Sequence, residues 1–203
     1  MFCGIAKGAD MARTCTVRKV RCQKEPVSEQ TAMLREIPLI CTDLAMPKRA
    51  RELIDEGLHR SKTIDCFDFV PSNYEAVYAV LGATPRGRFC EWGSGMGIVT
   101  GLAEMLGFES CGIEINAELA SSSRRLLGDF GLSATIETGD YFEICRDAEV
   151  YFTYCWPGQM PRVEEHFLSV TPGHARLLIC HGAEDIRCKV KPCIGHRLDN
   201  ALR

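Results

Sequence analysis

The chain has 203 residues, of which 46% are hydrophobic and 25% are charged, as expected for one globular domain with a full hydrophobic core. Its apolar runs are far shorter than the ~20 residues that cross a bilayer, and no apolar block of signal-peptide length opens the sequence, so we expect no membrane association. Residues 63–185 carry 7 basic and 18 acidic residues between basic ends, which argues against a broad groove for nucleic acid.

The N-terminal residues 1–27 show no hydrophobic periodicity, and we predict a disordered basic tail there. Residues 13–24 are basic and free of acids, a pattern that is also typical of a mitochondrial presequence. We therefore expect a cytoplasmic protein, with mitochondria as the second location.

Three helices are predicted next. Ser28 is a suitable N-cap for a helix over 28–36, which Pro38 would end. Pro47, a residue favoured at the first helical position, begins a second helix over 47–60. The pair Ser72 and Glu75 has the spacing of a capping box for a third.

From residue 88 onward, short apolar runs alternate with helical patterns. The predicted strands span 88–92, 109–115, 133–138, 149–156 and 175–181, and the helices span 97–107, 117–130 and 159–170. This alternation predicts an α/β, Rossmann-like, doubly wound and mostly parallel sheet flanked by helices. Right-handed crossovers then bring the C-terminal ends of the strands to one edge.

The end of the chain predicts a shortened C-terminal hairpin. Residues 186–190 supply one strand of it. Only 22 residues follow His181, so we do not expect a complete pair of strands. We therefore expect the substrate-side wall to be short, or to be built from the N-terminal helices or from a second subunit.

Twelve cysteines are scattered along the chain without any Cys-x-x-Cys spacing. Those on or beside predicted strands are Cys90, Cys111, Cys145, Cys155 and Cys180. Because a buried thiol behaves as a small apolar group, this pattern favours a reducing compartment over a disulfide framework. His181, Cys188, Cys193 and His196 lie near one another, but their spacing matches no common zinc arrangement, so we predict no metal site.

The most informative motif is the glycine-rich stretch 91–97, Glu-Trp-Gly-Ser-Gly-Met-Gly, between a predicted strand and a predicted helix. Glycines let the backbone approach a ligand closely, and a helix N-terminus offers free N–H groups to a negative charge. The dinucleotide pattern G-x-G-x-x-G fails, because Ile98 or Thr100 would stand at its last glycine. An NAD-linked oxidoreductase is therefore disfavoured. The pattern acid-x-Gly-x-Gly-x-Gly resembles the first motif of class I S-adenosylmethionine (SAM) methyltransferases.

The resemblance covers about residues 68–181 and implies a cofactor site. It implies that Glu91 holds the SAM ammonium, directly or through water, and that the loop approaches the methionine half of SAM. The loop residues are Gly93, Ser94, Gly95 and Gly97. Glu114, at the end of the second core strand, is suited to accept hydrogen bonds from both ribose hydroxyls. Asp140 would bind the adenine amino group, and Tyr141 would stack or lie on the adenine.

The fourth core strand ends in the sequence Thr-Tyr-Cys-Trp-Pro over 153–157. Methyltransferases that act on the amino groups of adenine or glutamine carry Asp/Asn-Pro-Pro-aromatic at this place, so the missing polar head argues against a nucleobase acceptor. We predict Tyr154 and Trp156 as catalytic residues that attract an amine through cation–π interactions. The alternative is that the two rings merely fill the edge of the sheet.

Two short matches point to the small seven-strand protein-lysine methyltransferases. They are the Val-Pro-Ser lead-in within 67–72 and Gly-Ile-Glu-Ile-Asn over 112–116. The resemblance implies methyl transfer to a nitrogen, with a protein lysine as acceptor, and the acidic centre of the chain is compatible with a cationic acceptor. It also implies that residues 28–87 form N-terminal helices and a segment covering the cofactor, and that residues 88–203 form the SAM-binding core. A small-molecule methyltransferase and a non-catalytic SAM-binding protein remain the alternatives, and the oligomeric state stays open.

Overall fold

The computed structural model of the protein describes residues 33–66, 69–180, 182 and 185–192. The predicted tail over 1–27 lies outside the described residues. So do His181, Cys193 and His196, three of the four side chains considered for zinc.

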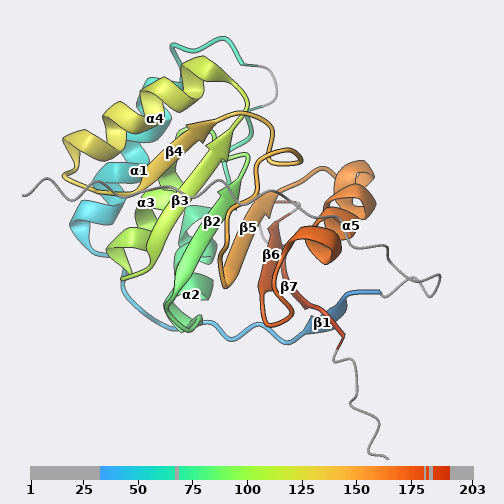
Figure 1. Ribbon diagram of the computed structural model, residues 1–203. Helices are drawn as coiled ribbons and strands as arrows, with labels where there is room; N and C mark the ends of the chain where they lie inside the picture. The colour runs from blue at the N-terminus through green and yellow to red at the C-terminus, as the bar shows by residue number, and fades with distance from the viewer. Residues whose placement is uncertain (1–32, 67–68, 181, 183–184, 193–203) are drawn as a thin grey trace, which may run out of the picture.

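Within this part of the chain, seven strands form one sheet in the order β1-β7-β6-β5-β2-β3-β4 (Figure 1). The strands are β1 (Arg35–Ile37), β2 (Arg88–Trp92), β3 (Glu109–Glu114), β4 (Thr135–Thr138), β5 (Val150–Tyr154), β6 (Arg176–Cys180) and β7 (Ile186–Val190). Strands β2 to β6 are parallel to their neighbours in that group, and β7 is antiparallel to β6 and β1. The predicted Rossmann-like, mostly parallel sheet is confirmed.

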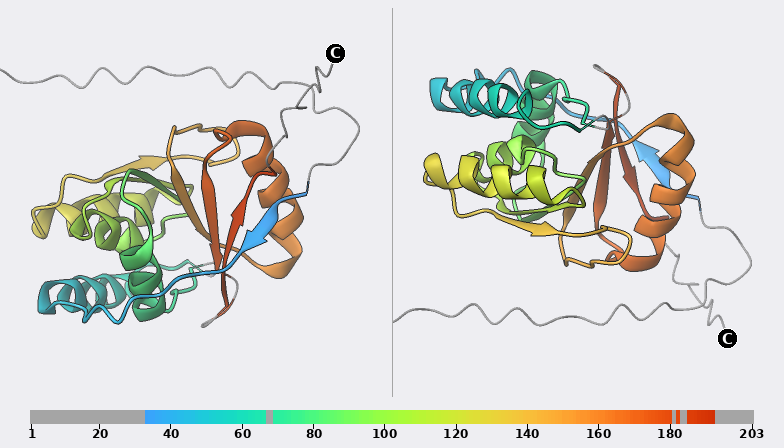
Figure 2. Two further views of the ribbon diagram at one scale, coloured as in Figure 1. Left: turned by 90° about the horizontal axis from the view of Figure 1, so that it is seen from below. Right: turned by 90° about the horizontal axis from the view of Figure 1, so that it is seen from above.

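Helices cover both faces of the sheet. They are α1 (Lys48–Ser61), α2 (Tyr74–Ala83), α3 (Ile98–Met105), α4 (Ala117–Asp129) and α5 (Met160–Val170), and a short 3-10 helix, η1 (Pro157–Gln159), precedes α5. Figure 2 shows α1 to α4 on one side of the sheet and α5 on the other. The predicted helices and strands of the core agree with these bounds to within two residues at each end.

The side-chain alternation of the strands explains why both faces need cover. In β2, Phe89 packs into the core beneath α1 to α3, whereas Cys90 and Trp92 pack into the core beneath α5. In β5, Phe152 and Tyr151 divide in the same way. Because successive strand residues point to opposite faces, strands with buried apolar residues at successive positions belong in a sheet buried on both sides.

The predicted helix over 28–36 is wrong in its described part, where Arg35–Ile37 forms strand β1. Arg35 pairs with Val190 and Ile37 with Cys188, so the N-terminal segment adds a strand beyond β7. The local pattern suggested a cap and a helix, but the free edge of β7 supplies backbone partners that no local pattern reveals. The expected C-terminal hairpin strand at 186–190 is confirmed as β7, and its outer partner comes from the opposite end of the chain.

The predicted capping box at the start of α2 is also wrong. Asn73, not Ser72, is the N-cap, and its Oδ1 accepts a hydrogen bond from the Ala76 N–H at 3.1 Å. Both residues have short polar side chains suited to capping, so the sequence alone did not discriminate between adjacent candidates.

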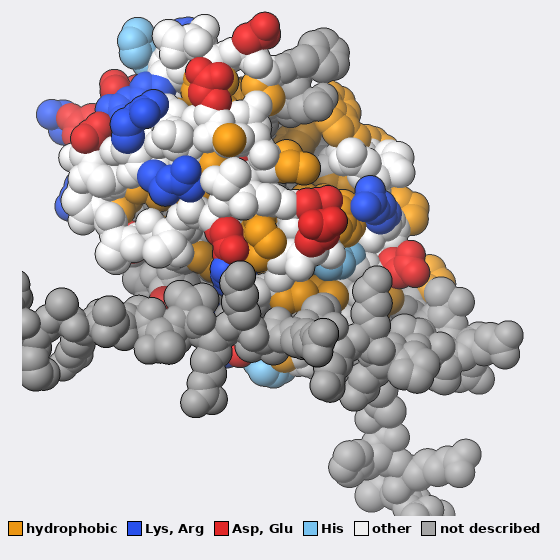
Figure 3. Space-filling view, turned by 45° about the horizontal axis from the view of Figure 1, so that its top comes forward, with side chains coloured by type: hydrophobic (Ala, Val, Ile, Leu, Met, Phe, Trp, Pro, Cys, Tyr) orange, Lys and Arg blue, Asp and Glu red, His pale blue; other side chains and the backbone are white. Residues whose placement is uncertain are grey.

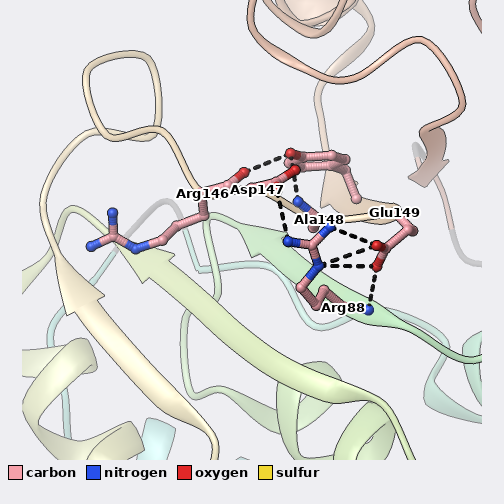
Figure 4. A network of polar contacts seen from close by, with 6 residues as sticks. Arg88, Arg146, Asp147, Ala148 and Glu149 are labelled. Carbon is pink, nitrogen blue, oxygen red and sulfur yellow. Dashed lines mark hydrogen bonds and ion pairs between the residues drawn. The ribbon is translucent and has the colours of Figure 1, made fainter. Parts of the chain in front are cut away.

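Charged side chains join β2 to β5 at the edge of the sheet where these strands begin (Figure 4). The Arg88 guanidinium contacts Asp147 at 2.6 Å and Glu149 at 2.6 Å, and the Arg88 N–H donates to the Glu149 carboxylate at 2.5 Å. Close by, the Tyr151 hydroxyl donates to the Arg146 carbonyl and accepts from the Ala148 N–H. These contacts secure the crossover from β4 to β5, whose residues 139–149 contain no helix.

We expect Arg88→Ala to lower the free energy of unfolding by about 1–2 kcal/mol, because it removes charge-assisted hydrogen bonds to two carboxylates. The matched control is Lys48→Ala, which removes an exposed ion pair with Glu52 and should change that energy by less than about 0.5 kcal/mol. Urea denaturation of both variants makes the comparison. Equal effects would show that the Arg88 contacts do not stabilise the crossover.

Candidate functional site

A cleft of about 450 Å³ opens where β2, β3, β4 and β5 end. Every predicted site residue except Gly97 lines it. These residues are Glu91, Gly93, Ser94, Gly95, Glu114, Asp140, Tyr141, Tyr154 and Trp156. Figure 3 turns this edge of the molecule partly forward and shows apolar and acidic side chains side by side there. The convergence expected from right-handed crossovers is therefore present.

The glycine loop presents backbone to the cleft. Gly93, Gly95 and Gly97 have φ of 73°, 52° and 69°, which is left-handed backbone that favours glycine. A Cβ on Gly93 would meet no atom within 4 Å, so the loop leaves open space beside it. A Cβ on Gly95 would lie 2.7 Å from the Phe69 ring. The loop thus combines an open side with a side covered by the lead-in to α2.

Gly97 lies outside the cleft lining and has a packing role. It is the N-cap of α3, and a Cβ there would come within 2.1 Å of the Ser123 hydroxyl of α4. The third glycine of the motif is therefore required by the contact between the loop and α4.

Glu91 is a buried acid at the end of β2. Its Oε2 accepts hydrogen bonds from the Thr100 N–H at 2.8 Å and from the Thr100 hydroxyl at 2.5 Å. Burial raises the pKa of Glu91 from its usual 4.5 to about 8, and the charge of Glu114 acts in the same direction, against the two hydrogen bonds. At neutral pH this carboxyl therefore holds a proton, and a cation placed beside it would favour the charged form.

Glu114 is fixed by backbone donors on both sides. Its Oε2 accepts from the Gly95 N–H at 2.6 Å, and its Oε1 accepts from the Asn116 N–H at 2.8 Å. The Asn116 side chain in turn caps α4. Since each carboxylate oxygen has two lone pairs, both oxygens can accept a further hydrogen bond from a ligand.

The turn after β4 carries Asp140 and Tyr141. The Asp140 Oδ1 accepts from the Phe142 N–H at 2.8 Å, which shapes the turn. The Tyr141 ring stacks on the Trp92 indole with a centroid distance of 5.4 Å and an interplanar angle of 3°. Burial raises the pKa of Tyr141 to about 12. One face of Tyr141 is therefore occupied by the core, and Phe142 joins it in the cleft lining.

The end of β5 forms the opposite wall. Tyr154 and Trp156 meet edge to face, with ring centroids 6.3 Å apart, and Trp156 is 51% exposed. Between them, Cys155 is buried, and burial raises the pKa of its thiol to about 11. This thiol is therefore a poor nucleophile at neutral pH.

Several lining or supporting residues were not predicted. Thr100 orders Glu91 from the first turn of α3, and Ile115, 69% exposed, lines the cleft directly after Glu114. Phe142 and Arg162 line it too, with the guanidinium carbon of Arg162 3.8 Å from the Phe142 ring centroid. The position of Ile115 beside Glu114 could have pointed to it. Arg162, 22 residues beyond Asp140 in α5, gave no such signal.

Two negative findings apply to the described residues. No three His, Cys, Asp or Glu side chains in this part of the chain gather as potential metal ligands, and Cys188 is buried in β7. No described helix has the length and apolar character needed to cross a membrane.

No protein-family model and no curated protein matches this sequence, whereas many solved structures match its fold. A methyltransferase from Geobacter sulfurreducens aligns with a TM-score of 0.56 and 15% identity, over 74% of this chain and 93% of that one. The O-methyltransferase TomG from Streptomyces achromogenes, solved in complex with SAM, aligns with a TM-score of 0.52 and 13% identity, over 68% of this chain and 66% of that one. The chain has the fold of a class I SAM-dependent methyltransferase.

The resemblance noted in the sequence is thus confirmed at the level of the fold. The length of chain shared with these methyltransferases varies. The mitomycin 7-O-methyltransferase MmcR aligns with a TM-score of 0.46 and 24% identity, over 53% of this chain and 35% of its own length. This chain spans about a third of the length of that protein and nearly all of the length of the Geobacter sulfurreducens methyltransferase.

The raised pKa of Glu91 predicts a pH-dependent stability. The folded protein holds this proton more tightly than the unfolded chain, so the free energy of unfolding should fall as pH rises from about 4.5 to about 8, by up to about 1.4 kcal/mol per pH unit. Glu91→Gln keeps an acceptor for Thr100 but has no proton to lose. Its free energy of unfolding should fall less steeply over this window in urea titrations. Equal slopes for the two proteins would contradict a proton held by Glu91.

Proposed function

We propose that the protein is a SAM-dependent methyltransferase. The observation that carries this proposal is the Glu114 carboxylate, which the Gly95 and Asn116 N–H groups orient at the edge of the cleft. Two vicinal ribose hydroxyls are a natural partner for its two oxygens, because hydroxyls donate and an ionised carboxylate only accepts. The three-dimensional fold adds independent support.

Two features of the cleft fit the cofactor. The Ser94 hydroxyl is buried, only 5% of the residue being exposed, and it has no hydrogen-bond partner. An unsatisfied buried hydroxyl is costly, so a polar ligand group at this place would stabilise it. The open space beside Gly93 lets a ligand approach the backbone of the same loop.

We propose that the methionine half of SAM lies along the glycine loop, with its ammonium near Glu91. A bound ammonium would favour the ionised form of this carboxyl and release its proton. The adenosine half lies between Glu114 and Asp140, where Ile115 and Phe142 offer apolar surface to the base.

We propose a core over 88–203 and an N-terminal part over 28–87 that adds β1 to the core sheet and helps to cover the site. Phe69, Val70, Ser72 and Tyr74 all line the cleft, so a segment that precedes the core helps to enclose it. A cytoplasmic location is part of this proposal, with mitochondria as the second candidate.

SAM supplies a methyl group on a positively charged sulfur, which leaves readily. The protein has to align the acceptor with that methyl group and exclude water, and such positioning can contribute about 7–11 kcal/mol to lowering a barrier. Tyr154 and Trp156 are suited to hold the acceptor because they line the cleft at the end of β5. Cys155 takes no part, because its buried thiol stays protonated.

We propose a nitrogen acceptor, with a protein lysine as the first candidate. The exposed Trp156 at the mouth supports it, because an aromatic face attracts an amine by about 0.5–2 kcal/mol. A small-molecule acceptor is the second candidate. It is favoured by Arg162, the only lysine or arginine among the described lining residues, which could pair with a carboxylate.

The cofactor assignment predicts the outcome of calorimetric titrations with SAM, S-adenosylhomocysteine (SAH) and NAD. The native protein should bind both adenosyl compounds and not NAD, and Glu114→Ala should weaken SAH binding by about 100-fold because two charge-assisted hydrogen bonds are lost. Glu118→Ala, an exposed acid in the first turn of α4, is the control and should bind normally. A folded native protein that binds neither adenosyl compound would refute the proposal.

The acceptor assignment predicts a separation between binding and turnover. Trp156→Ala should lower methyl transfer from radiolabelled SAM to its acceptor in cell extract by about 2- to 30-fold, with an unchanged Kd for SAH. Acid hydrolysis of the labelled product should yield methyl-lysine. Label in a small molecule would favour the second candidate, and binding without any labelled product would point to a non-catalytic SAM-binding protein.

A further inference from the structure

The turn over 140–142, which carries Asp140, belongs to a connection between β4 and β5 that contains no helix, so contacts with other elements must fix its position. Residues 139–149, all described, connect β4 to β5 as turns and extended chain. Asp140 organises the turn from within through its hydrogen bond with the Phe142 N–H. That bond shapes the turn but does not fix its direction relative to the sheet. Outside the turn, Tyr141 stacks on Trp92 of β2, and α5 supplies two further contacts on the same face of the sheet.

The first contact is a hydrogen bond from His166. The His166 Nε2 lies 2.8 Å from the Tyr141 carbonyl oxygen, and because a carbonyl only accepts, Nε2 carries the proton. The imidazole ring also packs against two aromatic neighbours, with centroids 5.0 Å from the Trp92 indole and 5.0 Å from the Phe142 ring. The middle of the turn is thus attached to α5 and to the sheet at once.

The second contact is the stacking of Arg162 on Phe142. The guanidinium carbon lies 3.8 Å from the ring centroid, within the range of a cation–π interaction. Arg162 and His166 are four residues apart in α5 and so occupy the same face of the helix. One face of α5 therefore contacts two consecutive residues of the turn, Tyr141 and Phe142.

We propose that His166 and Arg162 are positioning residues that aim the Asp140 carboxylate at the nucleobase of the cofactor. The inference rests on the proposed function, and it adds the device that gives the site its preference for adenine. The same segment of the chain reaches both ends of the cleft. It begins with Trp156 on the acceptor side and continues into α5, which holds the turn on the nucleobase side.

A nucleobase analogue separates positioning from general stability. In S-inosylhomocysteine a carbonyl oxygen replaces the adenine amino group of SAH and N1 carries a proton, so the group at C6 accepts and can no longer donate to Asp140. The ribose and amino-acid parts of the two compounds are identical. A correctly aimed Asp140 should favour SAH over the analogue by at least about tenfold, the usual range for a hydrogen bond to a charged group. If the turn is displaced, the preference for SAH over the analogue should disappear, while the affinity for the analogue changes little.

The experiment measures the Kd of both compounds by calorimetry, with melting temperatures, for the native full chain and four variants. In His166→Ala and Arg162→Ala the preference for SAH should fall below about threefold. His166→Gln, whose amide N–H can donate to the Tyr141 carbonyl, should restore most of it. Glu165→Ala is the control, an exposed α5 residue between the two positioning residues, and should keep the native ratio.

The outcomes distinguish this inference from the proposed function. Native-like ratios in both alanine variants would overturn the positioning role, and so would a native protein that binds the two compounds equally. If the native protein binds neither compound, the proposed function itself fails. Should His166→Ala not fold, Arg162→Ala and His166→Gln decide, because a low ratio in the first and a preserved ratio in the second support the proposal and the converse overturns it.

Discussion

The Glu114 carboxylate is the interaction on which the geometry of the site depends. It accepts from the N–H groups of Gly95 and Asn116, so one side chain joins the glycine loop, the end of β3 and the start of α4. Two residues earlier in β3, a Cβ on Gly112 would lie 2.7 Å from the Ser94 Cβ. The loop can therefore lie against β3 only because position 112 has no side chain and position 114 offers two acceptor oxygens.

Burial of two acids at one end of the sheet makes it unfavourable for both of them to be ionised. Burial, with a smaller contribution from the charge of the equally buried Glu114, raises the pKa of Glu91 and favours its protonated form. A cationic ligand group beside Glu91 would instead favour the ionised carboxylate and displace its proton. The arrangement that disfavours two ionised carboxylates therefore favours a ligand that combines hydroxyl donors with an ammonium.

The predictable parts of the fold are those that local sequence encodes. Strand and helix periods placed β2 to β6 and α3 to α5, because strands buried on both faces and amphipathic helices leave distinct patterns. Strand β1 was missed because three residues with two charges resemble a strand only when the edge of β7 is beside them. The N-cap of α2 was misplaced by one residue, since Ser72 and Asn73 are equally suited to capping.

By itself the sequence determined the core fold and the residues that converge on the cleft, because glycines, acids and strand ends at set spacings have few physical solutions. Only the tertiary structure decided what each residue does there. Gly97 serves packing against Ser123, and Tyr141 gives one face to Trp92. The hold of α5 on the turn after β4, through His166 and Arg162, also belongs to the tertiary structure. Such contacts join segments far apart in the chain, and their partners are set by packing, which leaves no periodic trace in the sequence.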